Sequence, residues 1–195
     1  MIQPQGGLGI VIGVVEKLDD PDGLGRVRVS YPHLGDELSE WAPFATLMAG
    51  GGRGTFFRPE PKDRVLLGFE YNDSRRPYIL GALWDQTHKP PADDGKPEEN
   101  NIRFIRSRSG HMIRLDDTDG SECVEVIDKD GKRRVRLDSS GETIQIVCEQ
   151  GHVEISASKS VTVHGDDVTV TADGDITVAA TGDLNLSGTN VNINA

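Results

Sequence analysis

The five histidines, the two cysteines and the aspartate pairs Asp116-Asp117 and Asp166-Asp167 are candidates for binding a metal ion or catalysing a reaction. The histidines are His33, His88, His111, His152 and His164. No two of them have the spacing of a metal-binding pair, and none lies in a known nucleophile–base motif. Cys123 and Cys148 lack a Cys-x-x-Cys pattern, so we expect reduced thiols rather than a zinc site. The sequence predicts no catalytic residue, no metal site and no cofactor.

Three other features have both a chemical and a structural interpretation. The pairs Asp116-Asp117 and Asp166-Asp167 lie in predicted turns, where solvated carboxylates are expected. The glycine-rich stretch 50–54 leads into strand-like residues, not into Gly-Lys-Ser/Thr at a helix start, so we interpret it as a loop rather than a phosphate site. His152 and His164 could bind an ion only if three copies met on an axis. Each adjoins an inward apolar residue, so we expect each to point outward.

A repeated unit, apolar–polar–apolar followed by a short turn, fills the C-terminal half of the chain. Six units between Val153 and Ile193 begin 7 or 8 residues apart, and five units between Ile102 and Ile146 begin 9 or 11 residues apart. Alternation of this kind is typical of strands, and the Gly and Asp clusters between units are typical of turns. The short, regular period predicts a β-solenoid whose middle residues face outward. Those middle residues are Arg103, Arg114, Glu125 and Arg136 upstream, and Thr162, Thr169, Thr177, Asn185 and Asn192 downstream.

One chain cannot close such a rod alone, because each unit supplies only two apolar side chains and leaves strand edges open. Three chains around one axis would cover these edges, with each chain forming one wall. The sequence therefore predicts a homotrimer, and an ordinary antiparallel meander in a monomer is the alternative. The predicted trimer core comprises Ile113, Leu115, Val124, Val126, Val135, Leu137, Ile144, Ile146, Val153, Ile155, Val161, Val163, Val168, Val170, Ile176, Val178, Leu184, Leu186, Val191 and Ile193.

The N-terminal part contains five or six short strand-like segments separated by Gly, Pro and Asp clusters. These segments predict a small closed barrel with Trp41, Phe44 and Trp84 in its core. Residues 86–101 are polar and contain Pro90-Pro91, which predicts an extended linker. We therefore divide the chain into a tail at residues 1–9, a barrel at 10–85, this linker, and a rod at 102–195. The predicted fold class is all-β.

The formal net charge is −11, and no Lys or Arg follows Lys159. Such a surface repels nucleic acid and anionic membranes, so neither is an expected partner. No stretch is long and apolar enough to span a bilayer, and no secretory signal begins the chain. We expect synthesis in the cytoplasm, with any export through a dedicated machine or by lysis.

Four stretches of the N-terminal part carry distinctive motifs. They are Asp20-Pro21-Asp22-Gly23-Leu24-Gly25-Arg26-Val27-Arg28-Val29, Trp41-Ala42-Pro43, Pro59 to Glu70, and Arg75 to Trp84. Together they resemble the oligonucleotide/oligosaccharide-binding-fold (OB-fold) domain of contractile-tail spikes. Ser109-Gly110-His111 with Asp116-Asp117 resembles the start of the β-helix in the same family. This family includes phage baseplate assembly protein V and the type VI secretion spikes of the valine-glycine-repeat type.

The resemblance implies a homotrimer with an OB-fold collar and a triple-stranded β-helix needle. It implies a place on the central axis of a contractile injection apparatus, where the tail tube drives the needle through the target cell envelope. A phage tail, a tailocin, an extracellular injection system and a type VI system all remain open. The resemblance further implies a structural component of a virion or virion-like particle and not an enzyme.

The chain also departs from parts of this family. Type VI spikes carry a large hub domain before the OB-fold, and only residues 1–9 stand there, so we expect either a separate hub protein on the collar or a sequence that is a fragment of a longer spike. Residues 86–101 leave no room for the lysozyme domain that some members insert. No histidine follows His164, so the apical iron site of some short phage spikes is not expected. The predicted rod ends bluntly at Asn192-Ile193-Asn194-Ala195, where we expect a PAAR-type tip protein to dock.

Three other functions remain as alternatives. A nucleic-acid or sugar-binding OB module would need a basic groove with exposed aromatic residues, whereas the predicted collar is mildly acidic. An envelope-cutting enzyme such as a muramidase would need an acid pair in a cleft, which a narrow rod lacks. A trimeric tail fibre or adhesin would share the rod but not the collar motifs.

Overall fold

The computed structural model describes residues 9–92 and 96–193. The chain separates into two compact units, Met1–Ile102 and Arg103–Ala195. Strands make up nearly all of the regular structure, so the fold is all-β, as the sequence predicts. The described residues contain no helix that is long and apolar enough to cross a membrane.

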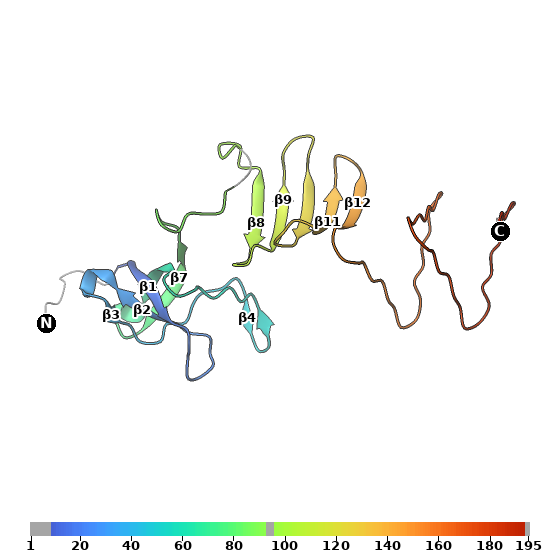
Figure 1. Cartoon of the computed structure of the whole chain (residues 1–195). Coiled ribbons are helices and arrows are strands. Elements are labelled where there is room, and N and C mark those ends of the chain that lie inside the picture. The colour runs from blue at the N-terminus through green and yellow to red at the C-terminus, as the bar shows by residue number, and fades with distance from the viewer. Residues whose placement is uncertain (1–8, 93–95, 194–195) are drawn as a thin grey trace. The chain divides into compact units, whose positions relative to one another are not determined.

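The first unit is built on a five-stranded sheet with the strand order β3-β2-β1-β6-β7 (Figure 1). Its neighbouring strands are all antiparallel. The strands are β1 (Val11–Lys17), β2 (Arg28–Tyr31), β3 (Glu37–Leu38), β6 (Arg64–Phe69) and β7 (Pro77–Leu83). Two short strands, β4 (Ala49–Gly50) and β5 (Arg53–Gly54), form a separate hairpin, and 3-10 turns lie at Pro32–Leu34 and Glu70–Asn72.

The segment after β3 joins the two sides of this sheet. Ala42 pairs in antiparallel fashion with Val27, just before β2, through backbone hydrogen bonds of 2.8 and 3.0 Å. Two residues further on, Phe44 forms a parallel bridge with Ile79 of β7. The backbone N–H of Ala45 donates to the carbonyl oxygen of Ile79 at 2.7 Å. Because one segment bonds to both sides, the sheet closes on itself as a small barrel.

Aliphatic side chains fill the barrel. Eight residues that are no more than 6% exposed form its core: Val15, Val27, Val29, Tyr31, Ala42, Val65, Leu67 and Ile79. Phe44 packs against this core, and Trp41 is half-buried with the Arg28 guanidinium 5.9 Å from its ring centroid. The prediction that Trp84 belongs to the core is wrong, because its side chain is 66% exposed. β7 ends at Leu83, and its pairing with β6 ends at the same residue. Trp84 comes after both, so neither strand covers its side chain.

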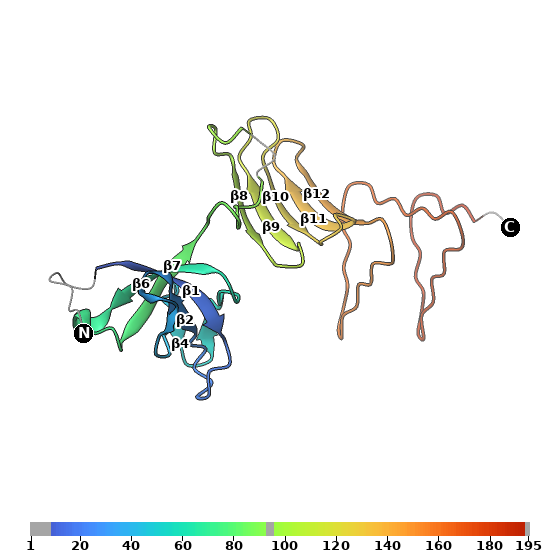
Figure 2. The ribbon, with the colours of Figure 1, turned by 60° about the vertical axis from the view of Figure 1, so that its left-hand side comes forward.

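The second unit begins with a five-stranded sheet in which strands that are consecutive in sequence are neighbours (Figure 2). The strands are β8 (Ile102–Arg106), β9 (Met112–Asp116), β10 (Cys123–Ile127), β11 (Arg133–Asp138) and β12 (Thr143–Cys148). The pairs from β9 to β12 are antiparallel. For residues 102–148 the structure therefore shows an antiparallel meander within one chain, which is the arrangement expected if the repeats did not form a trimer.

The turn between β10 and β11 illustrates why these strands reverse. Asp128 accepts hydrogen bonds from the backbone N–H of Lys132 at 3.0 Å and from Nε of Arg133 at 2.7 Å. Gly131 has a φ of 72°, a left-handed conformation that favours glycine. An aspartate that bonds to its own turn and a glycine that permits it are local signals, so the sequence itself encodes this reversal.

Regular structure ends at β12. None of the described residues from 149 to 193 lies in a strand or helix, and every residue from 151 to 193 is exposed. The chain runs here as an extended zigzag (Figures 1 and 2). The strands predicted between Val153 and Ile193 are thus absent from the single chain. Strands require hydrogen-bonded neighbours, and no described residue of the same chain pairs with this segment.

Candidate functional site

One face of the sheet β9–β12 consists of aliphatic side chains in two rows. Directly paired residues share a face of an antiparallel sheet, so the register of each strand pair defines these rows. We call this surface the apolar face, and it gathers the eight predicted core residues that lie before Cys148. One row is Leu115, Val124, Leu137 and Ile144, and the other is Ile113, Val126, Val135 and Ile146.

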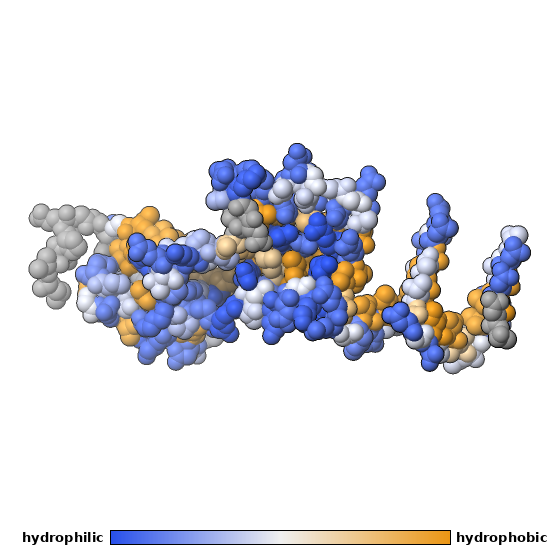
Figure 3. Space-filling model, turned by 45° about the horizontal axis from the view of Figure 1, so that its top comes forward, coloured by the Kyte–Doolittle hydropathy of each residue, from blue (hydrophilic) through white to orange (hydrophobic). Residues whose placement is uncertain are grey.

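The apolar face is uncovered in the single chain. Its residues in β9, β10 and β11 are 39–53% exposed, and Ile144 and Ile146 of β12 are 74% and 63% exposed. Figure 3 shows hydrophobic side chains on part of this unit and along the extended segment after it. A contiguous aliphatic surface over four strands is typical of a protein–protein interface rather than of a solvated surface.

The opposite face of the sheet carries a cluster of paired charges. Glu125 is 4% exposed and pairs across the sheet with Arg114 of β9 and Arg136 of β11. Its carboxylate oxygens lie 3.0 Å from Nη2 of Arg114 and 3.2 Å from Nη1 of Arg136. Arg114 is also 3.4 Å from a carboxylate oxygen of Asp116, and Arg136 is 3.2 Å from one of Asp138. We call these five residues the charge ladder, in which each charged side chain lies close to an oppositely charged one.

Neighbouring groups shift the pKa values of Asp138 and Arg136 in the charge ladder. The backbone N–H of Gly141 and the Arg136 guanidinium hold the pKa of Asp138 below its usual value. Burial acts to lower the pKa of Arg136, but Cys123, Glu125 and Asp138 nearby raise it overall. The two faces of the sheet therefore differ: the charged face has its partners within the chain, whereas the apolar face has none among the described residues.

β8 does not follow the predicted phase. Ile102 and Phe104 are partly buried, whereas Arg103 and Ile105 are exposed. Ile105, at 52% exposed, has the exposure typical of the apolar face. The strand contains apolar residues at 102, 104 and 105, so alternation alone could not decide which of them share a face.

In the single chain, the twelve predicted core residues after Cys148 do not cluster. They are 51–80% exposed on an extended backbone. They are Val153, Ile155, Val161, Val163, Val168, Val170, Ile176, Val178, Leu184, Leu186, Val191 and Ile193. Of the four residues predicted to dock a tip protein, Asn192 and Ile193 are exposed, and Asn194 and Ala195 lie outside the described residues.

In the first unit, a buried aspartate organises the turn between β1 and β2. The Asp20 side chain is 2% exposed and accepts a hydrogen bond from the backbone N–H of Leu24 at 3.0 Å. Nε and Nη2 of Arg26 donate to the same carboxylate at 3.0 and 2.6 Å. Hydrogen bonding between these side chains holds the pKa of Asp20 well below its usual range and raises that of Arg26. The turn therefore closes around a charged pair just before β2.

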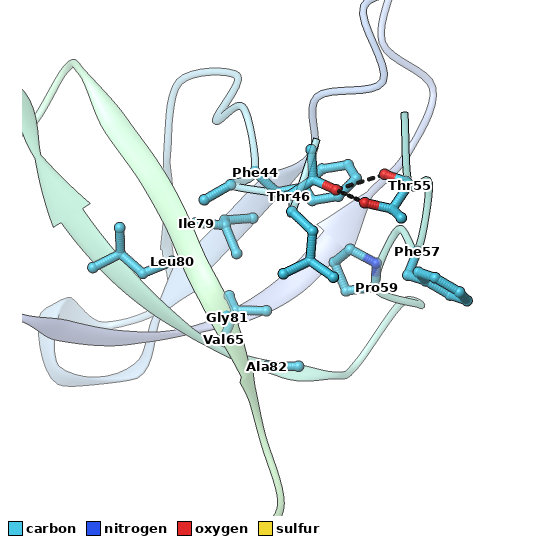
Figure 4. Close-up of a pocket in the computed structure, with 12 residues that line it drawn as sticks. Phe44, Thr46, Thr55, Phe57, Pro59, Val65, Ile79, Leu80, Gly81 and Ala82 are labelled. Carbon is cyan, nitrogen blue, oxygen red and sulfur yellow. Dashed lines mark hydrogen bonds between the residues drawn. The ribbon is translucent and has the colours of Figure 1, made fainter. Parts of the chain in front are cut away.

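A shallow groove of about 430 Å³ lies beside β7, where the closing segment leaves the barrel (Figure 4). Phe44, Phe57 and Leu80 contribute to its apolar lining. The Thr46 hydroxyl lies 2.6 Å from both the carbonyl and the hydroxyl oxygen of Thr55. The residues that line the groove include no ionisable side chain. The groove could hold an apolar side chain, but it offers no acid, base or metal ligand.

The closed barrel coincides with a known domain family. Residues 11–84 match the family model of the type VI secretion system/phage-baseplate injector OB domain. The match runs from the first residue of β1 to the residue after β7. The barrel belongs to this injector OB-domain family. No curated protein matches the chain.

The resemblance inferred from the sequence motifs is thus confirmed for the injector OB domain. Asp20 to Val29 contains the buried ion pair and the start of β2, and Trp41-Ala42-Pro43 lies in the segment that closes the barrel. Pro59 to Glu70 contains β6, and Arg75 to Trp84 contains β7. Each motif therefore has a structural role in the injector OB domain.

The residues that could bind a metal remain dispersed. Within the part of the chain that the structure describes, no three His, Cys, Asp or Glu side chains gather into a possible metal site. The prediction that Asp116 is a solvated turn carboxylate is wrong. Asp116 ends β9, is 12% exposed and pairs with Arg114, whereas its neighbour Asp117 is 64% exposed. Cys123 is buried and Cys148 is half-buried, and both are free thiols.

Proposed function

We propose that this chain is the central spike of a contractile injection apparatus and acts as a homotrimer. The observation that carries the proposal is the apolar face, an uncovered aliphatic surface in the same chain as an injector OB domain. Three copies would bring their apolar faces together around one axis, with the charge ladders outward. The OB domains would form a collar around that axis.

Burial of the apolar face provides the driving force for this assembly. Fully burying a Val, Leu or Ile side chain stabilises by roughly 1.5–3 kcal/mol relative to leaving it exposed. These side chains are already about half buried, so each would add about 1 kcal/mol on assembly. Eight such residues per chain favour trimerisation before the entropic costs of association and ordering are subtracted.

The extended segment 151–193 would complete the spike as a triple-stranded β-helix. Its apolar residues repeat with the alternation of strands, yet the single chain supplies neither a core nor strand partners for them. In a trimer the same residues would face the axis and the backbone would pair with neighbouring copies. The needle of the spike therefore depends on assembly for both its core and its hydrogen bonds.

The proposed role is mechanical, without catalysis. The tail tube would drive the needle through the envelope of a target cell, and intertwined chains cannot separate without unwinding. The relevant stability is then the slow rate of unfolding under load. A separate hub protein would dock on the OB collar. A PAAR-type tip protein would cover the needle end at Asn192, Ile193, Asn194 and Ala195.

The particle would be a phage tail or a phage-tail-like injection particle, and synthesis would be cytoplasmic. The injector OB domain supports this setting over a trimeric fibre or adhesin, which would need no such domain. The groove beside β7 carries no charged group that could bind a nucleic acid or a sugar acid. This favours a spike over a free OB-fold binding module.

The test is to locate the chain in assembled particles. A copy with a short peptide tag in the exposed β4–β5 turn at Gly51 and Gly52 would be expressed in the producing cells, and particles would be labelled with antibody–gold. We expect gold at the baseplate end of the tube, on its axis. Label on radial fibres, or tagged protein that never enters particles, would contradict the proposal.

A further inference from the structure

The five-stranded sheet of the second unit has two edge strands, β8 and β12, and the chain leaves the sheet from β12. β12 pairs with β11 over all six of its residues, from Thr143 opposite Asp138 to Cys148 opposite Arg133. Among the described residues, no segment pairs with its other edge. The backbone N–H and C=O groups on that edge therefore await a partner strand.

The next repeat has the features of the missing strand but does not fill the position in its own chain. Residues 149–152 form a connector as long as residues 139–142, which join β11 to β12. Val153 follows Ile144 by 9 residues, as Ile144 follows Val135. A hairpin from β12 to residues 153–157 would thus match the hairpin from β11 to β12 in length and phase. Residues 153–157 nevertheless run away from the sheet and pair with no strand in the described part of their own chain.

The connector itself directs the chain away from the sheet. Gly151 has a φ of 112°, a conformation that side-chain-bearing residues rarely adopt. The Cys148 thiol lies 3.4 Å from the carbonyl oxygen of Gln150 and 3.7 Å from that of His152. These contacts hold the connector in a local loop at the end of β12, and the chain continues from it in extended form (Figure 1).

The exposure of β12 indicates where a neighbour belongs. Ile144 and Ile146 are 74% and 63% exposed, whereas Val135 and Leu137 on the adjacent strand are 39% and 47% exposed. Those pairs lie in the same two rows, so the excess exposure comes from the missing strand. A strand with the alternation of residues 153–157 would place its two apolar side chains beside these isoleucines.

We propose that residues 153–157 of one copy add as a strand to the open edge of β12 in a neighbouring copy. This inference rests on the proposed trimer and assigns its first interchain strand pair. Each chain offers the β12 edge and the unpaired segment 153–157, so three copies can pair these two elements with one another in a closed ring. β12 is then the boundary at which pairing within a chain becomes pairing between chains.

The test places a benzophenone photo-crosslinking amino acid at Gln145 in the full chain. Gln145 is exposed in the middle of β12. Trypsin releases residues 137–159 as one peptide, because no Lys or Arg lies between Arg136 and Lys159. β12 and residues 153–157 both lie on this peptide. A link within one chain therefore gives a single looped peptide, and a link between chains gives two joined copies.

We expect joined copies with the acceptor inside residues 153–157. A reciprocal variant with the crosslinker at Glu154 should give joined copies with the acceptor inside β12. A matched control at Lys129, exposed in the turn after β10, should give no link to residues 153–157.

Solution mass measured on the same samples separates the two proposals. A trimer that yields looped peptides, or joined peptides with the acceptor elsewhere, would overturn the strand exchange and leave the spike standing. A monomer would overturn both.

Discussion

The two units of this chain use the same aliphatic residue types in opposite ways. In the injector OB domain, Val15, Val27, Val65 and Leu67 are completely buried within one chain. In the second unit, the valines, leucines and isoleucines of the apolar face and of the extended segment are 39–80% exposed. The first unit therefore buries its aliphatic residues within one chain, whereas the second leaves its aliphatic residues exposed.

This difference shows that strand alternation and sheet closure are separate properties. The barrel closes because one segment bonds to Val27 on one side and Ile79 on the other. The sheet β8–β12 has no closing segment among the described residues, so both its apolar face and its edge at β12 stay open. We infer that the first unit can fold alone and that the second is completed by further copies.

The largest expected effect comes from a charge on the apolar face. Val126→Asp would place a carboxylate between Ile113 and Val135, where each copy in the trimer would bury it without a partner. Burial of an unpaired charge costs several kcal/mol, and the trimer would bear that cost three times. We expect the variant to be monomeric by analytical ultracentrifugation, with the barrel still folded by tryptophan fluorescence.

The matched control adds the same charge to the other face. Gln145→Glu lies opposite Arg136 on the charged face, where a carboxylate is compatible with the ladder. We expect this variant to remain trimeric. A Val126→Asp protein that kept its trimer would break the proposed contrast between the two units.

The second prediction concerns the barrel core. Leu67→Ala removes a fully buried side chain, and such substitutions cost about 2–5 kcal/mol. Urea unfolding followed by tryptophan fluorescence measures this loss, because Trp41 and Trp84 both lie in the first unit. Leu47→Ala, at a residue that is 95% exposed, should change stability by less than about 0.5 kcal/mol. Dissociation of the Leu67→Ala trimer under native conditions would show that the units are not independent.

A smaller effect is expected in the charge ladder. Glu125→Gln leaves Arg114 and Arg136 without their shared carboxylate, but the amide oxygen can keep one of the two contacts, so the loss is roughly the 1.5–3 kcal/mol of one hydrogen bond to a charged group. We expect a trimer that unfolds at lower temperature by circular dichroism. Glu142→Gln, at an exposed turn residue, is the control and should unfold like the parent protein. Loss of the trimer in Glu125→Gln would mean that the charged face, not the apolar face, holds the copies together.

The smallest effect is a change in pH dependence at Asp20. The folded pKa of Asp20 lies below the unfolded value of about 3.9, so the charged carboxylate stabilises the barrel above that pH. This contribution is lost as the pH falls below about 4. We expect the melting temperature of the parent protein to fall more steeply between pH 5 and pH 3 than that of Asp20→Asn, by tryptophan fluorescence. Asp19→Asn, at an exposed neighbour, should keep the parent slope.

Local patterns account for what the sequence predicted well. Alternation in units such as Val124–Val126 and Val135–Leu137 placed the apolar residues on one face, because side-chain direction in a strand depends only on position. The stretch from Asp20 to Val29 was one of four whose combined resemblance to a known family implied the OB-fold, and its turn is formed by contacts among its own residues. Both signals act over a few residues and need no knowledge of distant partners.

Features that depend on distant partners could not be predicted. The parallel bridge of Phe44 with Ile79 and the exposure of Trp84 both depend on which segments meet across the barrel. The units before and after Cys148 share one pattern, yet only the earlier ones pair within the chain. Two signs accompany that change: beyond Val153 the repeat shortens to 7 or 8 residues, and its middle residues become Thr and Asn. The charge ladder had a signal too, because Arg114, Glu125 and Arg136 follow one another at steps of 11 residues.

The central claim is that the second unit requires further copies, and solution mass tests it most directly. Multi-angle light scattering on the full chain, over a dilution series, measures the particle mass against the chain mass of 21.2 kDa. The account predicts three times that mass at every dilution, because intertwined chains cannot leave singly. A particle of 21.2 kDa that stays soluble and folded would contradict the account.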